Sequence, residues 1–122
     1  MRYIFILLLS IFLCSCTEQI KYISVEEFNV FSENDYELVD VRTLKEFQSG
    51  HISRAINIDF FSDNFIDEIN EFDTSLNVIL YCRTDNRSSK SAKILADNNF
   101  NNIYVIKGGI EEWISQGNPV SF

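Results

Sequence analysis

Short runs of apolar residues alternate along the chain with segments whose apolar positions fall three or four residues apart. Runs rich in β-branched and aromatic side chains are typical of buried strands, and the spaced segments are typical of helices that pack by one face. We expect strands at 20–23, 37–42, 55–58, 76–81 and 103–106, and helices at 25–31, 44–49, 65–70, 90–97 and 109–116. Strands that alternate with helices in one small domain predict a mainly parallel sheet covered on both faces.

Local signals refine this pattern. Ser24 and Glu27 have the spacing of a capping box, which predicts a helix start just after Ser24. Leu44 and Ile66 are expected to face the core from the second and third helices. Phe61 is also expected in the core, with the wall of a cleft as the alternative.

The length and the charge of the chain limit its function. A chain of 122 residues is long enough for one domain with its own core and too short for two. Its formal net charge is -8, whereas a nucleic-acid-binding surface is basic, so we expect no nucleic-acid partner. One histidine and no Cys-x-x-Cys pair give no basis for a metal site, and no motif indicates a cofactor.

The start of the chain resembles a bacterial lipoprotein signal. A positive charge at Arg2 precedes an almost continuously apolar stretch over 3–13, which is too short for a comfortable membrane span. Leu13 and Ser15 stand at the positions of a lipobox before Cys16, so the resemblance implies cleavage before Cys16 and lipidation of its thiol.

This resemblance divides the chain into a signal peptide at 1–16 and a single domain at 17–122. The lipid would tether the domain to a membrane of the cell envelope, outside the cytoplasm and on the periplasmic side in a two-membrane bacterium. The alternative is an uncleaved N-terminal anchor, which would leave the domain membrane-bound in the same compartment.

Cys82 stands where the apolar run 76–81 ends, and polar residues follow it up to the helix expected at 90–97. In a strand-loop-helix unit, the N–H groups of the loop and the helix N-terminus form a site for an anion. A thiolate is an anion, and positive charge from Arg83 and Arg87 favours the thiolate form. We therefore expect a reactive thiol; the alternative is a structural cysteine that closes a buried strand.

The three cysteines of the chain have different fates under this hypothesis. Cys14 would leave with the signal and Cys16 would carry the lipid, so Cys82 would be the only thiol of the mature domain. An intramolecular disulfide then has no partner, and a lone thiol in a secreted protein indicates reactivity.

Three segments resemble, in order, the motifs of rhodanese-like domains. The first motif corresponds to 38–42, Glu46, Phe47, 50–52, Ala55 and 57–58, the active-site loop to 82–88, and the C-terminal motif to 105–109 and Trp113. The resemblance covers nearly all of 17–122. It implies a three-layer α/β/α fold with a central parallel sheet.

The resemblance also implies sulfur transfer. Cys82 would take a sulfane sulfur from a donor such as thiosulfate, hold it as a persulfide, and pass it to a thiol or a cyanide-like acceptor. Backbone N–H groups around the sulfur would stabilise both charged forms. The loop residues that would bind the donor are Arg83, Thr84, Asp85, Asn86, Arg87 and Ser88. In support, Asp40 is expected to hold neighbouring backbone, and Arg42 to pair with Glu46 across one helical turn.

Asp85 departs from the family pattern, because single-domain members usually carry a glycine at this place, where the backbone takes a positive φ. Aspartate tolerates that conformation better than most residues, so the loop can still close. Its carboxylate would, however, place a negative charge near a thiolate and an anionic donor. We therefore expect poor turnover of thiosulfate and a different physiological donor or acceptor.

Two other functions stay open at this point. The first is a non-catalytic rhodanese-like module that binds sulfur or a partner protein at the cell envelope. The second is a cysteine phosphatase, which also places a thiolate in an arginine-bearing loop. That family needs one more residue in the loop than the four that separate Cys82 from Arg87.

Overall fold

The computed structural model of the chain describes residues 19–122. The signal expected at 1–16, its lipidation site Cys16 and the expected start of the domain at residue 17 lie outside the described residues. Within 19–122, none of the helices has both the length and the apolar content that a membrane span requires.

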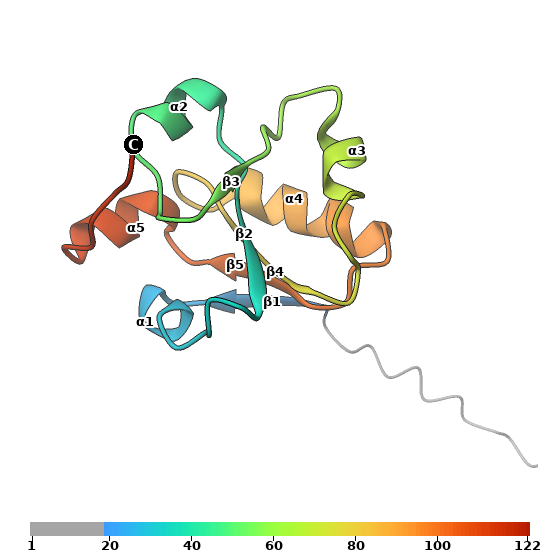
Figure 1. The fold of residues 1–122 in the computed structure, drawn as a ribbon, viewed down its shortest axis with the longest axis horizontal. Helices are drawn as coiled ribbons and strands as arrows, with labels where there is room; N and C mark the ends of the chain where they lie inside the picture. The colour runs from blue at the N-terminus through green and yellow to red at the C-terminus, as the bar shows by residue number, and fades with distance from the viewer. Residues whose placement is uncertain (1–18) are drawn as a thin grey trace, which may run out of the picture.

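A five-stranded sheet forms the centre of the molecule (Figure 1). Its strands are β1 (Ile20–Ile23), β2 (Tyr36–Asp40), β3 (Ile56–Asn57), β4 (Asn77–Tyr81) and β5 (Ile103–Ile106). Their order is β1-β5-β4-β2-β3, and every neighbouring pair is parallel. The mainly parallel sheet expected from the sequence is thus parallel throughout.

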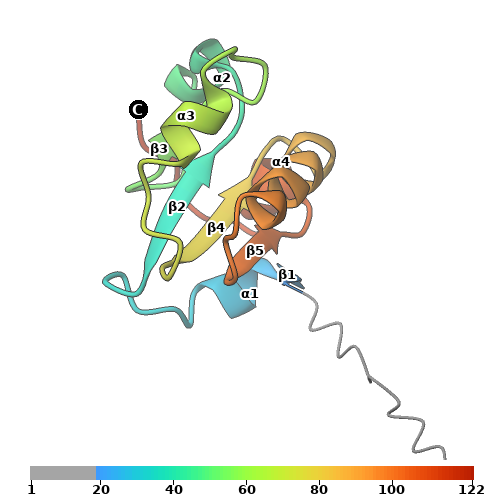
Figure 2. The same ribbon diagram turned by 90° about the vertical axis from the view of Figure 1, so that its right-hand side faces the viewer.

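Helices cover both faces of this sheet, which gives the three-layer α/β/α architecture that was expected. The helices are α1 (Val25–Phe28), α2 (Leu44–Gln48), α3 (Phe65–Ile69), α4 (Asn86–Asp97) and α5 (Gly109–Ser115). Figure 2 shows α3 and α4 in front of the strands, and α1 and α5 pack against the opposite face. The short helix α2 follows the end of β2.

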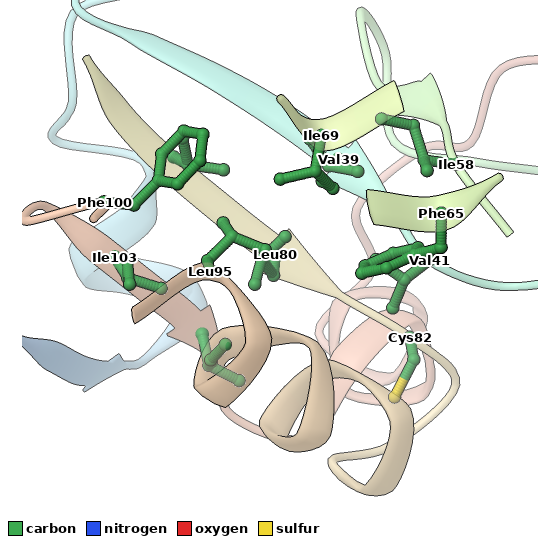
Figure 3. Close-up of a cluster of buried hydrophobic side chains, with 13 residues drawn as sticks. Val39, Val41, Ile58, Phe65, Ile69, Leu80, Cys82, Leu95, Phe100 and Ile103 are labelled. Carbon is green, nitrogen blue, oxygen red and sulfur yellow. The ribbon is translucent and has the colours of Figure 1, made fainter. Parts of the chain in front are cut away.

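Alternate residues of β4 point to opposite faces, as the pleat of a strand requires. Val78 and Leu80 join the cluster under α3 and α4, whereas Ile79 and Tyr81 join the cluster under α1 and α5. Cys82 continues the first row. Figure 3 shows its side chain at the end of that cluster, with the sulfur directed towards the first turn of α4.

The two ends of the sheet have different roles. Asp40 is in register with Tyr81, so the ends of β2 and β4 bring Cys82 and the segment after Asp40 to the carboxyl end of the sheet. The chain enters β1 at the amino end, where the N–H of Ile103 donates to the carbonyl oxygen of Gln19. Ligands of parallel sheets bind at the carboxyl end.

The capping box at Ser24 and Glu27 is confirmed, since each donates a backbone N–H to the other's side chain. The expected inward positions of Leu44 and Ile66 are wrong, because these side chains are 56% and 48% exposed. In α3 the buried face is formed by Phe65 and Ile69, one turn apart, and Ile66 lies off it. The helix α2 buries none of its five residues. Phe61 is likewise outside the core, at 67% exposure.

Candidate active site

Cys82 directly follows β4 and is buried to 1% exposure. Its Sγ lies 3.3 Å from Oγ of Ser88 and accepts the backbone N–H of Ser88 at 3.4 Å. Both contacts come from the first turn of α4, whose N-terminus carries a partial positive charge. Among the described residues, Cys82 is a free thiol.

The helix α4 starts at Asn86, earlier than the expected residue 90. The polar residues that were assigned to the loop therefore form its first turn, and Ser88 is fully buried within it. Apolar spacing could not reveal this start, because the turn packs Ser88 rather than an apolar side chain.

The loop after Cys82 turns its carbonyl groups towards α5. The N–H groups of Ile110 and Glu111 donate to the carbonyl oxygens of Cys82 and Arg83 at 3.0 and 3.2 Å. Gly109 makes this approach possible at φ +57, since a Cβ there would lie 2.4 Å from the Cys82 oxygen and 2.7 Å from the Arg83 oxygen. The sequence analysis did not predict this contact; the paired glycines at 108–109 are the sequence feature that accompanies it.

In a trans peptide, the N–H points opposite to the C=O. Because the C=O groups of this loop point towards α5, its N–H groups point to the other face of the sheet, on which the Cys82 side chain lies. Within the described chain, no backbone N–H of residues 83–87 has a backbone acceptor. Of the backbone N–H groups around the sulfur, that of Ser88 donates to it in the described chain.

Asp85 does not adopt the expected positive φ: its φ is −134°, and it is the N-cap residue of α4. The helix begins at the next residue, and an N-cap residue has a non-helical backbone with negative φ. Its carboxylate accepts the N–H of Gly108 at 2.9 Å. Asp85 therefore links the active-site loop to the turn between β5 and α5.

Arg87 is bound by Glu46 of α2 through two hydrogen bonds, of 2.7 and 3.0 Å. Glu46 also accepts hydrogen bonds from Thr43, in a second capping box that the sequence analysis did not identify. The hydrogen bonds from Arg87, with those from Thr43, lower the pKa of Glu46 from 4.5 to about 2. The expected pair between Arg42 and Glu46 is therefore wrong.

Arg83, Thr84 and Asn86 lie on the surface of the loop. Nε of Arg83 donates to Glu111 of α5 at 2.6 Å, and this hydrogen bond raises the pKa of Arg83. Within 19–122, the side chains of Thr84 and Asn86 make no recorded hydrogen bond.

The partner of Arg42 is Asp40, in a buried pair at the end of β2. Nη2 of Arg42 lies 2.7 Å from Oδ2 of Asp40 and donates to the carbonyl oxygen of Gly50 at the same distance. Asp40 also accepts the backbone N–H of Arg42 at 2.9 Å, which is the backbone contact expected of it. The pair fixes the chain on the strand next to β4.

Phe61 borders this region with an exposed ring. The guanidinium carbon of Arg87 lies 5.9 Å from the centre of that ring, and Phe60 packs against its edge. Among the described residues, no three His, Cys, Asp or Glu side chains are grouped to hold a metal ion.

The Rhodanese-like domain family matches residues 25–116, and the chain belongs to that family. It is 37% identical over 93 residues to the uncharacterized protein YqhL of Bacillus subtilis, covering 76% of this chain and 71% of YqhL. It is also 31% identical to the tRNA uridine(34) hydroxylase of Photorhabdus laumondii, over 84% of this chain. The chain spans only about a third of that hydroxylase, 32% of its length.

A solved structure with the same fold is that of a rhodanese-like domain protein from Staphylococcus aureus. The two share 26% identity with a TM-score of 0.71, over 84% of this chain and 97% of the other. The fold inferred from the sequence motifs is thereby confirmed.

Proposed function

We propose that this domain is a sulfurtransferase that carries sulfane sulfur as a persulfide on Cys82. The observation that carries the proposal is the contact of the Cys82 sulfur with the N–H and hydroxyl of Ser88, beside loop amides without a backbone acceptor in the described chain. Such donors stabilise an anion held at that point. Sulfur carried as a thiolate or as a persulfide is such an anion.

In the first step, the Cys82 thiolate attacks the outer sulfur of a sulfane donor. A bond forms between Sγ and that sulfur, and the bond that held the sulfur to the donor breaks. Its electron pair leaves with the donor fragment, which is sulfite for thiosulfate and a thiolate for an organic persulfide. A thiol or cyanide-like acceptor then takes the outer sulfur and restores Cys82.

We also propose that a lipid on Cys16 holds the domain at the cell envelope. Gln19 lies at the amino end of the sheet and Cys82 at its carboxyl end. The few residues between Cys16 and Gln19 span about 10 Å at most. A lipid there would keep the amino end next to the membrane and leave Cys82 towards the aqueous side.

The pairing of Arg87 weighs against the phosphatase hypothesis. Both Nη atoms of Arg87 donate to Glu46, and this carboxylate beside the guanidinium disfavours a phosphoryl dianion at the same place. Hydrolysis of p-nitrophenyl phosphate would test this directly, and we expect none that depends on Cys82.

The test of the sulfurtransferase is intact-mass spectrometry of the full chain in detergent, after incubation with thiosulfate or an organic persulfide. We expect a gain of one sulfur atom that is lost on adding cyanide or a thiol and that is absent from Cys82→Ser. If neither donor adds sulfur although iodoacetamide alkylates Cys82, the proposal fails and the non-catalytic binding module takes its place.

A further inference from the structure

Both arginines of the active-site loop are already paired with carboxylates. Arg87 donates two hydrogen bonds to Glu46, and Arg83 donates to Glu111 at 2.6 Å. A sulfonate group such as that of thiosulfate is bound most strongly by a guanidinium that offers two free N–H groups. Each guanidinium keeps further N–H groups, but the carboxylate beside it offsets much of its positive charge and so weakens its attraction for an anion.

The loop also carries a negative charge without a cation. Asp85 accepts the backbone N–H of Gly108, and within the described chain it forms no ion pair. The backbone of Asp85 lies close to the sulfur, because the hydroxyl of Ser88 lies 3.3 Å from both the Asp85 carbonyl oxygen and the sulfur of Cys82. Its carboxylate is directed to the turn between β5 and α5, so its charge acts on the site through space rather than by contact. The whole chain adds to this field with a formal net charge of -8.

One exposed aromatic ring lies beside Arg87. Phe61 is 67% exposed and lies against Arg87. An exposed aromatic ring next to a paired arginine can contact an uncharged organic group, and it offers nothing to an anionic oxygen.

We propose that the donor of this site is an organic persulfide, R–S–SH, with an uncharged tail, and that the site discriminates against thiosulfate by charge. This inference rests on the proposed sulfurtransferase activity. Thiosulfate is a dianion, whereas such a persulfide is neutral or a monoanion, so the charge of Asp85 repels thiosulfate more strongly. Asp85 is the residue that determines this selectivity.

The transfer from a persulfide balances without another reactant. The Cys82 thiolate attacks the outer sulfur of R–S–SH, and an S–S bond forms to Sγ. The S–S bond of the donor breaks, and its electron pair leaves on R–S⁻. The proton stays on the transferred sulfur, and no oxidant or reductant is consumed.

The experiment measures the rate at which Cys82 gains one sulfur, by intact mass of the full chain in detergent at low salt. The probes are thiosulfate and the persulfide of N-acetylcysteamine. Because the two differ in intrinsic reactivity, each is compared only with itself across variants and salt concentrations. The decisive variant is Asp85→Asn, which removes the charge and keeps an oxygen for the N–H of Gly108.

We expect Asp85→Asn to speed loading from thiosulfate about fourfold. This is the rate change expected when the repulsion between one charge and a dianion ~10 Å away in water is removed. Loading from the persulfide should change by about twofold at most, since it carries at most one negative charge. Added sodium chloride should accelerate the wild-type reaction with thiosulfate, because salt screens repulsion. Glu111→Gln, which frees Arg83, should act in the same direction as Asp85→Asn.

The matched control is Asp67→Asn, which removes an exposed charge from α3. The selectivity proposal is overturned if Asp85→Asn and Asp67→Asn load alike from thiosulfate, or if salt slows the wild-type reaction. In either case loading from the persulfide would still establish the sulfurtransferase. If neither donor loads the wild type, the proposed function fails and the selectivity with it.

Discussion

The sulfur of Cys82 and the hydroxyl oxygen of Ser88 lie 3.3 Å apart, in the buried first turn of α4. The same hydroxyl lies 3.3 Å from the carbonyl oxygen of Asp85. A hydroxyl has one proton, so it donates to only one of these acceptors at a time. It can donate to Asp85 while the sulfur is a thiol, and it can turn to the sulfur once a thiolate or a persulfide forms.

Ser88→Ala should therefore slow both alkylation of Cys82 and sulfur loading about tenfold to a hundredfold, because a hydrogen bond to a charged group contributes ~1.5–3 kcal/mol. The measurement is the rate of reaction with iodoacetamide at fixed pH, followed by intact mass. Ser89→Ala is the control, since the neighbouring hydroxyl contacts Tyr22 instead. Equal rates for the two variants would contradict this role of Ser88.

Gly109→Ala should destabilise the protein by more than ~3 kcal/mol and abolish sulfur loading. The new Cβ would lie within 2.7 Å of three loop carbonyl oxygens, so the active-site loop must move. Urea unfolding followed by circular dichroism measures the loss.

Gly117→Ala separates this clash from backbone strain. Gly117 also has a positive φ, of 81°, but a Cβ there meets nothing within 4 Å. Its substitution should cost only about 1–2 kcal/mol and leave sulfur loading intact. Similar losses for the two glycines would show that strain alone explains the effect of Gly109→Ala.

Glu46→Gln should lower the free energy of unfolding by about 1 kcal/mol at pH 7, because the ion pair with Arg87 is partly exposed. The folded-state pKa of Glu46, about 2, lies below its ordinary 4.5, so the pair stabilises the fold above pH 4.5. That contribution is lost as the pH falls from 4.5 towards 2. The difference between wild type and variant should shrink over the same range.

Urea unfolding at several pH values measures this difference, and Glu68→Gln provides a control at an exposed carboxylate of α3. A difference that stays constant from pH 7 to pH 2.5 would show that the effect of Glu46→Gln does not come from the ionised carboxylate.

The strands were predictable because a parallel sheet buried on both faces produces continuous apolar runs, such as 103–106. All five lie where the sequence indicates, with ends that differ by a few residues. The start of α4 was not predictable by the same means, because its first turn is polar and serves Cys82 rather than the core. The apolar pattern of a sequence indicates which residues pack in the core, whereas this turn contains Ser88, which contacts the sulfur of Cys82.

The partners of the charged residues were the least predictable part of the site. Arg87 and Glu46 are 41 positions apart, so no local spacing could reveal their pairing. Local reasoning assigned Glu46 to Arg42 instead, which in the structure turns to the buried carboxylate of Asp40. Similarly, the glycine of related loops suggested a positive φ at Asp85, but the earlier start of α4 makes that residue an N-cap.

The direction of β1 decides how this protein can be attached to a surface. The chain enters β1 at Gln19, beside the first residues of β5, and the length of β4, ~16 Å at 3.3 Å per residue, separates that end from Cys82. A bead or sensor chip coupled ahead of Gln19 therefore holds the molecule by the end of the sheet opposite Cys82. Immobilised in this way, the loop that covers the buried thiol faces the solution.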